Sequence, residues 1–278
     1  MYQGRGEEAM ILAAAVLELQ AQNAGRLPVS QGRLLHAAFL NSIRSLDAEL
    51  SARMHDAANK SFSLGHLQLQ QSAQKMTFQL QAGTQAKWRI CLMGDSAKAV
   101  LQLLHPGFRL QVGSVAFVVK DVYRTQREHS QAGLTTTEYL ESQCAELPLV
   151  SQLTMDFISP TTFRYFDHDY PWPKPELVFG SLAERWNKIS GEEHFAVDKV
   201  KEIAAAYLLP ERWQGNSKRV NVSPQHGVTG FVGSFTYKLT LLPPEFRAMF
   251  ISLGEFAVFA GVGRLTGQGL GQVKVRYK

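Results

Sequence analysis

The chain ends in the stretch GVGRLTGQGLGQVKVRYK, which runs from Gly261 to Lys278. Five glycines fall in its first eleven residues: Gly261, Gly263, Gly267, Gly269 and Gly271. Glycine-rich loops that bind phosphate usually open a helix. Only seven residues follow the last of these glycines. The loop therefore needs a different explanation, and that explanation constrains the fold of the second half of the chain.

Two familiar nucleotide-binding motifs do not fit this context. A dinucleotide fingerprint needs a strand before it, a helix after it and an acidic residue roughly 20 positions later. A Walker A loop ends in Gly-Lys-Ser or Gly-Lys-Thr, whereas this loop ends in Gly-Leu-Gly. An amphipathic helical pattern precedes the loop, over residues 243–260. The stretch is therefore a link between a helix and a final strand.

The residues after the loop alternate in character. Val273, Val275 and Tyr277 fall on one side of a strand, and Lys274, Arg276 and Lys278 fall on the other. The loop itself adds Arg264, Thr266 and Gln268 and contains no acidic residue. Glycines let a backbone approach a ligand closely, so one interpretation is a contact with a polyanion backbone. The other is a structural turn beside a solvated edge strand. The residues alone leave both open.

The composition favours a folded protein of one large domain or two ordinary ones. The chain has 278 residues, 45% of them hydrophobic, and a formal net charge of +5. The two cysteines, Cys91 and Cys144, are typical of reduced thiols rather than of a disulfide framework. No apolar run approaches the ~20 residues of a membrane span, so we expect a cytoplasmic protein without a membrane segment. No metal-ligand spacing and no cofactor motif is present, so we expect neither group.

The first half follows the order β-α-β-β-(β)-α-β. We interpret the apolar run at 9–19 as a buried strand or short helix rather than a signal peptide, because Glu7 and Glu8 precede it. A helical stripe follows at 30–46, where Leu35, Phe39 and Leu46 share one face. Strand-like segments lie at 62–70, 75–83, 87–94 and 108–124, with a helix signal at 95–107.

The second half repeats this order loosely. It has strand patterns at 153–164, 218–223, 227–241 and 271–278, and helix patterns at 175–189, 198–209 and 243–260. A polar, threonine-rich stretch at 129–144 separates the halves. The pattern predicts an α+β protein of tandem ferredoxin-like (RRM-like) domains, over residues 1–140 and 141–278.

The loop has the form G-x-G-x-x-x-G-x-G-x-G before the last strand of a second ferredoxin-like domain, and this resembles the RAMP superfamily of CRISPR-associated proteins. Within that superfamily the chain resembles the endoribonucleases that cut precursor CRISPR RNA. FISPTTFR, YPWPKPELVFGSLAERW and GVTGFVGSFTYKL resemble the second domain of these enzymes. LDAELSARMHDAANKSFSL resembles their N-terminal segment, with a histidine before a Lys-x-Phe stretch.

The resemblance implies a metal-independent cleavage in which the ribose 2′-hydroxyl attacks the adjacent phosphate. Such a reaction leaves a 2′,3′-cyclic phosphate and a 5′-hydroxyl, and it needs a base, an acid and a cation. His55 matches the catalytic histidine of the family by position, and Lys60 matches its cation, with Arg53 as a reserve. His36 is the competing histidine, and we rank His55 ahead of it. Some members carry a tyrosine on the first helix; residues 32–46 contain none.

The implied partner is CRISPR repeat RNA, bound by the glycine loop and the last strand. The proposed contacts are Gly261, Gly263, Arg264, Thr266, Gly267, Gln268, Gly269, Gly271, Lys274 and Arg276. An effector complex is a further candidate partner, and a monomer and a homodimer are both compatible with the sequence. Two alternatives stay open: a non-catalytic RAMP subunit that holds RNA in an effector complex, and an unrelated two-domain protein with a structural turn.

Overall fold

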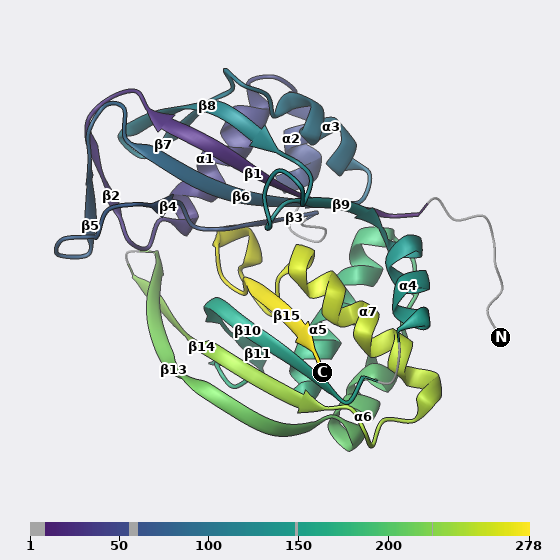
Figure 1. The fold of residues 1–278 in the computed structure, drawn as a ribbon. Coiled ribbons are helices and arrows are strands. Elements are labelled where there is room, and N and C mark those ends of the chain that lie inside the picture. The colour runs from purple at the N-terminus through teal and green to yellow at the C-terminus, as the bar shows by residue number, and fades with distance from the viewer. Residues whose placement is uncertain (1–8, 56–60, 148–149, 224) are drawn as a thin grey trace.

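The computed structural model describes residues 9–55, 61–147, 150–223 and 225–278. The chain forms two lobes, one above the other in Figure 1, with the glycine loop at their junction. In the described part of the chain, each lobe contains an antiparallel sheet with helices packed against it, of seven strands in the first lobe and four in the second. Within the described residues, no helix is both long and apolar enough to cross a membrane.

The first sheet is built on the ferredoxin-like order. Its path is β3 (Phe62–Leu64), β6 (Gln85–Met93), β1 (Ile11–Ala21), β8 (Val115–Tyr123) and β7 (Arg109–Val112). β4 (Gln68–Leu69) also pairs with β6, and β9 (Gly133–Thr136) also pairs with β1. The helices of this lobe are α1 (Gly32–Arg44), α2 (Ala48–His55) and α3 (Ser96–Leu103). β2 (Gly25–Pro28) and β5 (Thr77–Leu80) form a separate ribbon.

The second sheet has the same topology. Its order is β13 (Leu209–Ser223), β14 (His226–Lys238), β10 (Gln152–Thr161) and β15 (Val273–Tyr277). α5 (Pro175–Ser190) follows its first strand, and α7 (Pro244–Ala260) precedes its last. Two elements are inserted after β10: the hairpin of β11 (Phe163–Tyr165) and β12 (His168–Tyr170), and the helix α6 (Val197–Tyr207). In both sheets the first strand of the unit lies between the third and the fourth, which is the ferredoxin-like arrangement.

These findings confirm the prediction of tandem ferredoxin-like domains. Helix α5 begins at Pro175, and Gly191 ends it with a left-handed φ of 78°. In α1, Leu35 and Phe39 are fully buried as expected, but the helix ends at Arg44 and leaves Leu46 57% exposed. The alternation of the last strand is confirmed, because Val273 is buried while Lys274 and Arg276 are exposed.

Several elements were not expected from the sequence. Helix α2 lies in a segment for which no element was predicted, and the hairpin β11–β12 follows directly on a predicted strand. The threonine-rich stretch holds β9 and α4 (Thr137–Glu146) rather than a linker. Leu140 and Cys144 of α4 belong to the core of the second lobe. The division at residue 140 falls within this helix, and we keep it as a proposal.

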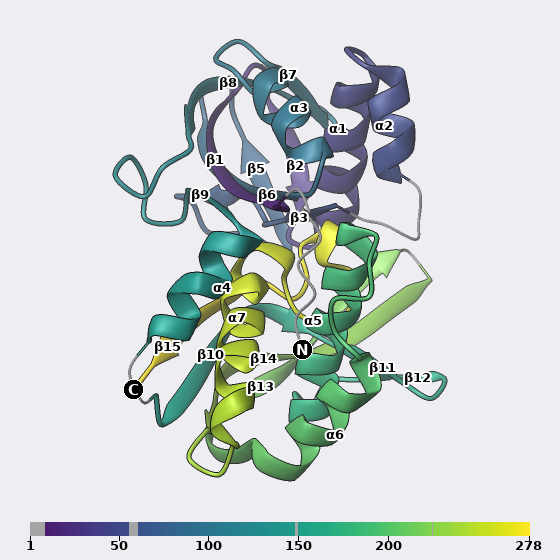
Figure 2. The ribbon, with the colours of Figure 1, turned by 90° about the vertical axis from the view of Figure 1, so that its right-hand side faces the viewer.

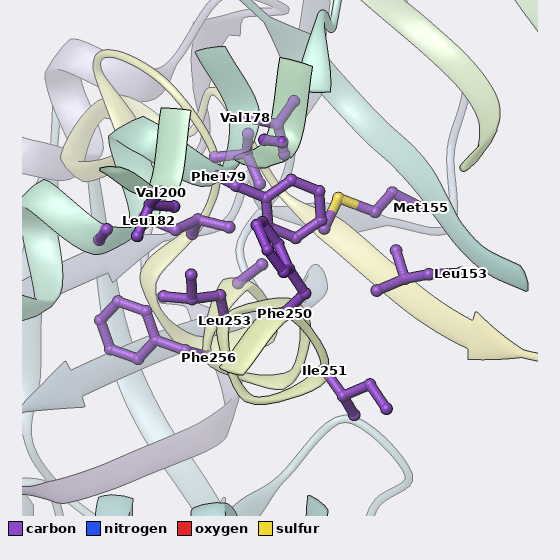
Figure 3. Packing of buried hydrophobic residues seen from close by; sticks show 14 of the residues in the cluster. Leu153, Met155, Val178, Phe179, Leu182, Val200, Phe250, Ile251, Leu253 and Phe256 are labelled. Atoms are coloured by element: carbon purple, nitrogen blue, oxygen red, sulfur yellow. The ribbon is translucent and has the colours of Figure 1, made fainter. Parts of the chain in front are cut away.

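The hydrophobic core of the second lobe lies between its sheet and its helices (Figure 3). Phe250 of α7 packs edge-on against Phe179 of α5, with ring centroids 5.0 Å apart. Met155 of β10 closes this cluster from the sheet side. The same cluster includes Leu12 and Met93 of the first lobe. The core therefore extends across the junction and anchors one lobe on the other.

Candidate functional site

The glycine loop folds back on its own ends between α7 and β15. Gly261, Gly263, Gly269 and Gly271 have φ between 70° and 86°, a region that other residues rarely adopt. A Cβ added at Gly263 would lie 2.3 Å from the carbonyl oxygen of Thr162, at the end of β10. Within the loop, Thr266–Gln268 form one short 3₁₀ turn. The glycines thus permit a tight turn of the backbone that residues with a Cβ atom could not adopt.

The middle of the loop lies against the first lobe. A Cβ at Gly32, the first residue of α1, would lie 1.7 Å from the carbonyl oxygen of Gln268. A Cβ at Gly267 would meet the rings of Phe62 and His36 at 3.2 and 3.4 Å. The positive end of the α1 dipole therefore faces the loop, an arrangement that favours a nearby anion.

His36 is fixed against this loop by a hydrogen bond between the lobes. Its Nδ1 lies 2.9 Å from the carbonyl oxygen of Gly267. A carbonyl oxygen only accepts, so in the neutral ring the proton sits on Nδ1 and Nε2 is the basic nitrogen. The ring also packs on Phe62, with centroids 5.5 Å apart. This geometry holds the imidazole in one orientation, which is what a general base requires.

His66 is a second histidine at the loop, and sequence reasoning left it unassigned. A Cβ on Gly269 would lie 2.8 Å from its Nε2 atom. Its Nδ1 atom is buried, with no hydrogen-bond partner among the described residues. Burial, followed by the charge of Lys218, lowers the pKa of His66 below its ordinary value of 6.5. The available signal was Gly65, which interrupts the alternating pattern of the strand just before this histidine.

Arg185 links α5 to both sides of the junction. Its guanidinium donates to the hydroxyl of Thr266 in the loop and, over 2.9 Å, to the carbonyl oxygen of Phe62. Burial lowers the pKa of Arg185 to about 10, so the group keeps its charge near neutral pH. Sequence reasoning also missed this residue, although an arginine directly before the buried Trp186 of α5 was a usable signal.

The structure places His55, the histidine ranked first, at the end of α2, where its side chain is exposed. Helix α2 packs against α1, the helix that carries His36. Lys60 lies outside the described residues. Arg53, the reserve cation, pairs with Glu49 at 3.1 Å on the surface of α2. Of the catalytic candidates that are described, His36 is the one in contact with the glycine loop.

The proposed RNA-binding residues differ in their surroundings. Thr266 is 3% exposed and bonded to Arg185, while Arg264 pairs with Asp169 at the edge of the loop. Arg276 forms two hydrogen bonds with Asp156, at 2.8 and 2.9 Å, which hold the pKa of that carboxyl below its usual range. Lys274 is exposed and lines a cleft of about 260 Å³ between the lobes. Lys274 is therefore better placed than Arg276 to contact an anion.

The two ferredoxin-like lobes, with the glycine loop of the second lying against the first, agree with the resemblance to the RAMP superfamily. A model of the CRISPR Cas6 N-terminal domain matches residues 13–131, and a model of the CRISPR-associated endoribonuclease Cas6 matches residues 155–273. The chain belongs to the Cas6 family.

Individual relatives agree with this assignment. A CRISPR-associated endoribonuclease Cas6 of Mycobacterium tuberculosis (strain CDC 1551 / Oshkosh) is 26% identical over 208 residues, which are 69% of this chain and 60% of the relative. A solved Cas6 product complex is 27% identical, with a TM-score of 0.71 over 96% of this chain and 99% of that one. Thermus thermophilus Cas6 is 23% identical, with a TM-score of 0.72 over 97% and 100%. The chain spans 60% of the length of the curated relative.

Proposed function

We propose that this protein is an endoribonuclease that cleaves precursor CRISPR RNA within its repeats. The observation that carries the proposal is the 2.9 Å contact between His36 Nδ1 and the Gly267 carbonyl oxygen. It holds the ring with Nδ1 toward the loop, so that Nε2 is the basic nitrogen, and the half-buried Arg264 and Gln268 of the loop suit a phosphate backbone. Family membership and the similarity to a Cas6 product complex support the choice of RNA as substrate.

The proposed reaction uses no metal ion. His36 Nε2 takes the proton of the ribose 2′-hydroxyl, whose oxygen attacks the adjacent phosphorus. The bond to the 5′-oxygen breaks, and that oxygen receives a proton from an acid. The products carry a 2′,3′-cyclic phosphate and a 5′-hydroxyl. The α1 N-terminus beside the loop favours the negative charge that develops on the phosphate.

We propose His55, which the resemblance implies as base or acid, as the acid and Lys60 as the cation. His55 ends the helix that packs on α1, so it belongs to the same lobe as His36. We now rank His36 ahead of His55 as the base, because His36 is held in one orientation by a backbone carbonyl whereas the His55 side chain is exposed. Fixed orientation is a large part of what a catalytic base contributes.

The test is cleavage of the cognate repeat RNA in EDTA, under single-turnover conditions, by the wild type, His36→Ala and His55→Ala. His105→Ala, a change to an exposed turn histidine, is the control. We expect His36→Ala to slow cleavage roughly 10²- to 10⁴-fold while RNA affinity changes little. The 3′ end of the upstream product should be a cyclic phosphate.

Other outcomes would change the proposal in defined ways. Cleavage that EDTA abolishes and Mg²⁺ restores would overturn the metal-free mechanism. Loss of cleavage with His55→Ala but not with His36→Ala would return the role of base to His55. Tight binding without any cleavage by the wild type would favour the alternative, a non-catalytic RNA-holding subunit.

A further inference from the structure

The short hairpin β11–β12 projects from the second lobe (Figure 2) and carries aromatic residues at its tip. Phe166 is 83% exposed, and Tyr165 beside it is 38% exposed. Their rings meet edge-on with centroids 4.9 Å apart, and Tyr170 lies 5.2 Å from Tyr165. The hairpin therefore presents a small aromatic surface to solvent.

The turn that carries Phe166 is unfavourable for folding alone. Tyr165 pairs with His168, so the turn consists of Phe166 and Asp167. A two-residue turn in which only the first residue has a positive φ favours glycine at that position. Phe166 has a φ of 50°, which a large side chain rarely adopts. A strained backbone that exposes an aromatic ring indicates a functional constraint.

Basic side chains lie beside this aromatic surface. Lys174 Nζ lies 5.0 Å from the ring centroid of Tyr165 and 5.4 Å from that of Tyr170. A cleft of about 370 Å³ opens beside the hairpin. Its lining includes five basic residues, Arg164, Arg185, Lys188, Lys201 and Arg264, against the two acidic residues Glu176 and Glu184. Four of these basic residues pair with carboxylates, and phosphates would bind in the cleft by exchanging with those partners.

The hairpin is attached directly to the glycine loop. The backbone N–H of Arg264 donates to the carbonyl oxygen of Thr162 over 2.9 Å, and the Arg264 side chain pairs with Asp169 of β12. Three residues further along the loop, Gly267 contacts His36. A nucleic acid strand that lies along the loop therefore reaches the basic cleft and then the aromatic tip.

We propose that the β11–β12 hairpin is a stacking platform for an unpaired nucleobase of the bound RNA, with Phe166 and Tyr165 as the contacting rings. The basic cleft takes the neighbouring phosphates. This combination of aromatic faces and a cationic groove is how proteins hold single-stranded RNA. The inference rests on the proposed function, because it takes RNA as the ligand of the glycine loop.

The first test is the affinity of the full chain for its cognate repeat RNA, measured by fluorescence anisotropy in EDTA on RNA with a 2′-deoxy nucleotide at the cut. We expect Phe166→Ala to weaken binding roughly 5- to 150-fold, since a stacked base contributes on that scale. Phe166→Trp should bind like the wild type. Tyr139→Ala is the matched control, because Tyr139 is 61% exposed on α4, across the lobe from the hairpin.

The second test identifies the base. In a series of repeat RNAs that each lack one nucleobase, one unpaired position should weaken wild-type binding by the same factor as Phe166→Ala. Phe166→Ala should bind that abasic RNA as tightly as it binds the intact RNA, because the ring and the base act through the same contact. Equal losses at every position in both proteins would overturn base stacking.

The two proposals fail separately. If the wild type binds the RNA and Phe166→Ala binds it equally well, the platform is overturned and the proposed function stands. If Phe166→Ala and Tyr139→Ala weaken RNA binding by the same factor, the stacking platform is also overturned. If the wild type binds no repeat RNA, both proposals are wrong.

Discussion

The two histidines at the glycine loop have different surroundings, and these assign them different tasks. His36 contacts a backbone carbonyl that fixes its tautomer. His66 has a buried Nδ1 without a hydrogen-bond partner among the described residues, and its charged form is disfavoured. His36 therefore suits proton transfer, whereas His66 suits packing against the loop as an uncharged ring. Protonation of His66 at low pH would destabilise the fold.

The lowered pKa of His66 predicts an acid-sensitive fold. The unfolded chain takes up a proton on this histidine as the pH falls through 6.5, while the folded chain resists until its lower pKa is reached. The contribution of His66 to the free energy of unfolding is therefore fully present above pH 6.5. It decreases as the pH falls from 6.5 toward the pKa of His66 in the folded chain. We expect His66→Gln to show a smaller drop in Tm than the wild type between about pH 7.5 and about pH 5.5.

Thermal unfolding at the two pH values provides the check. His105→Gln is a control, because that histidine is exposed in a turn and bonds only locally, to Pro106. Equal drops in Tm for the wild type and His66→Gln would show that His66 does not contribute to the acid sensitivity.

At the scale of elements, the glycine loop acts by close approach as well as by its backbone angles. Gly269 and Gly83 both have a φ of 86°, but their surroundings differ. A Cβ at Gly269 would lie 2.8 Å from His66, whereas a Cβ at Gly83 would meet nothing within 4 Å. Alanine substitutions at these two glycines therefore distinguish the free-energy cost of backbone strain from the cost of displacing His66.

Gly269→Ala should destabilise the protein more than Gly83→Ala. We expect Gly83→Ala to cost about 1 kcal/mol of unfolding free energy, from the left-handed backbone alone. Gly269→Ala should cost about 1–3 kcal/mol more, because His66 must move in a packed site. It should also slow RNA cleavage, whereas Gly83→Ala should leave the rate unchanged. Urea unfolding and single-turnover cleavage measure the two effects, and equal losses of stability would contradict the close packing.

At the scale of the whole molecule, hydrogen bonds hold the lobes in register. Arg89 of β6 donates to the carbonyl oxygen of Gln131 at 2.9 Å in its own lobe and to that of Val258 in α7 at 3.0 Å. Ser63 of β3 donates to the carbonyl oxygen of Phe259 at 2.6 Å. The end of α7 is thus fixed by the first lobe just before the glycine loop begins, and this fixes the loop against His36.

Arg89→Met should loosen this junction. The change removes the guanidinium donor and leaves the half-buried carbonyl of Val258 with only the weak thiol donor of Cys91, at a cost of about 1–3 kcal/mol. We expect the unfolding transition in calorimetry to broaden or split as the lobes uncouple, and cleavage to slow. Arg124→Met is the matched control, since Arg124 donates to the carbonyl oxygens of Leu101 and Leu104 within the first lobe. If both variants keep one transition and wild-type cleavage, Arg89 is not a coupling residue.

Local signals predicted most of the elements, and their failures have physical causes. Helix α2 was missed although Asp47 accepts a hydrogen bond from the N–H of Leu50, as a helix cap does. Helix α4 was missed because its threonine-rich start resembles a loop, and its burial depends on α7 of the same lobe. The β11–β12 turn was missed because its positive φ falls on Phe166, a residue type that gives no turn signal.

The sequence by itself determined the two ferredoxin-like units, the glycine loop before the last strand and the alternating tail, since these follow from periodicity and from glycine spacing over short distances. Only the tertiary structure decided which side chains meet at the loop. His36 and Gly267 are 231 residues apart, and Arg185 reaches across the junction to Phe62. Such contacts depend on how the two sheets and their helices dock, which no local pattern specifies. For the same reason the structure, rather than the sequence, changed the ranking of His36 and His55.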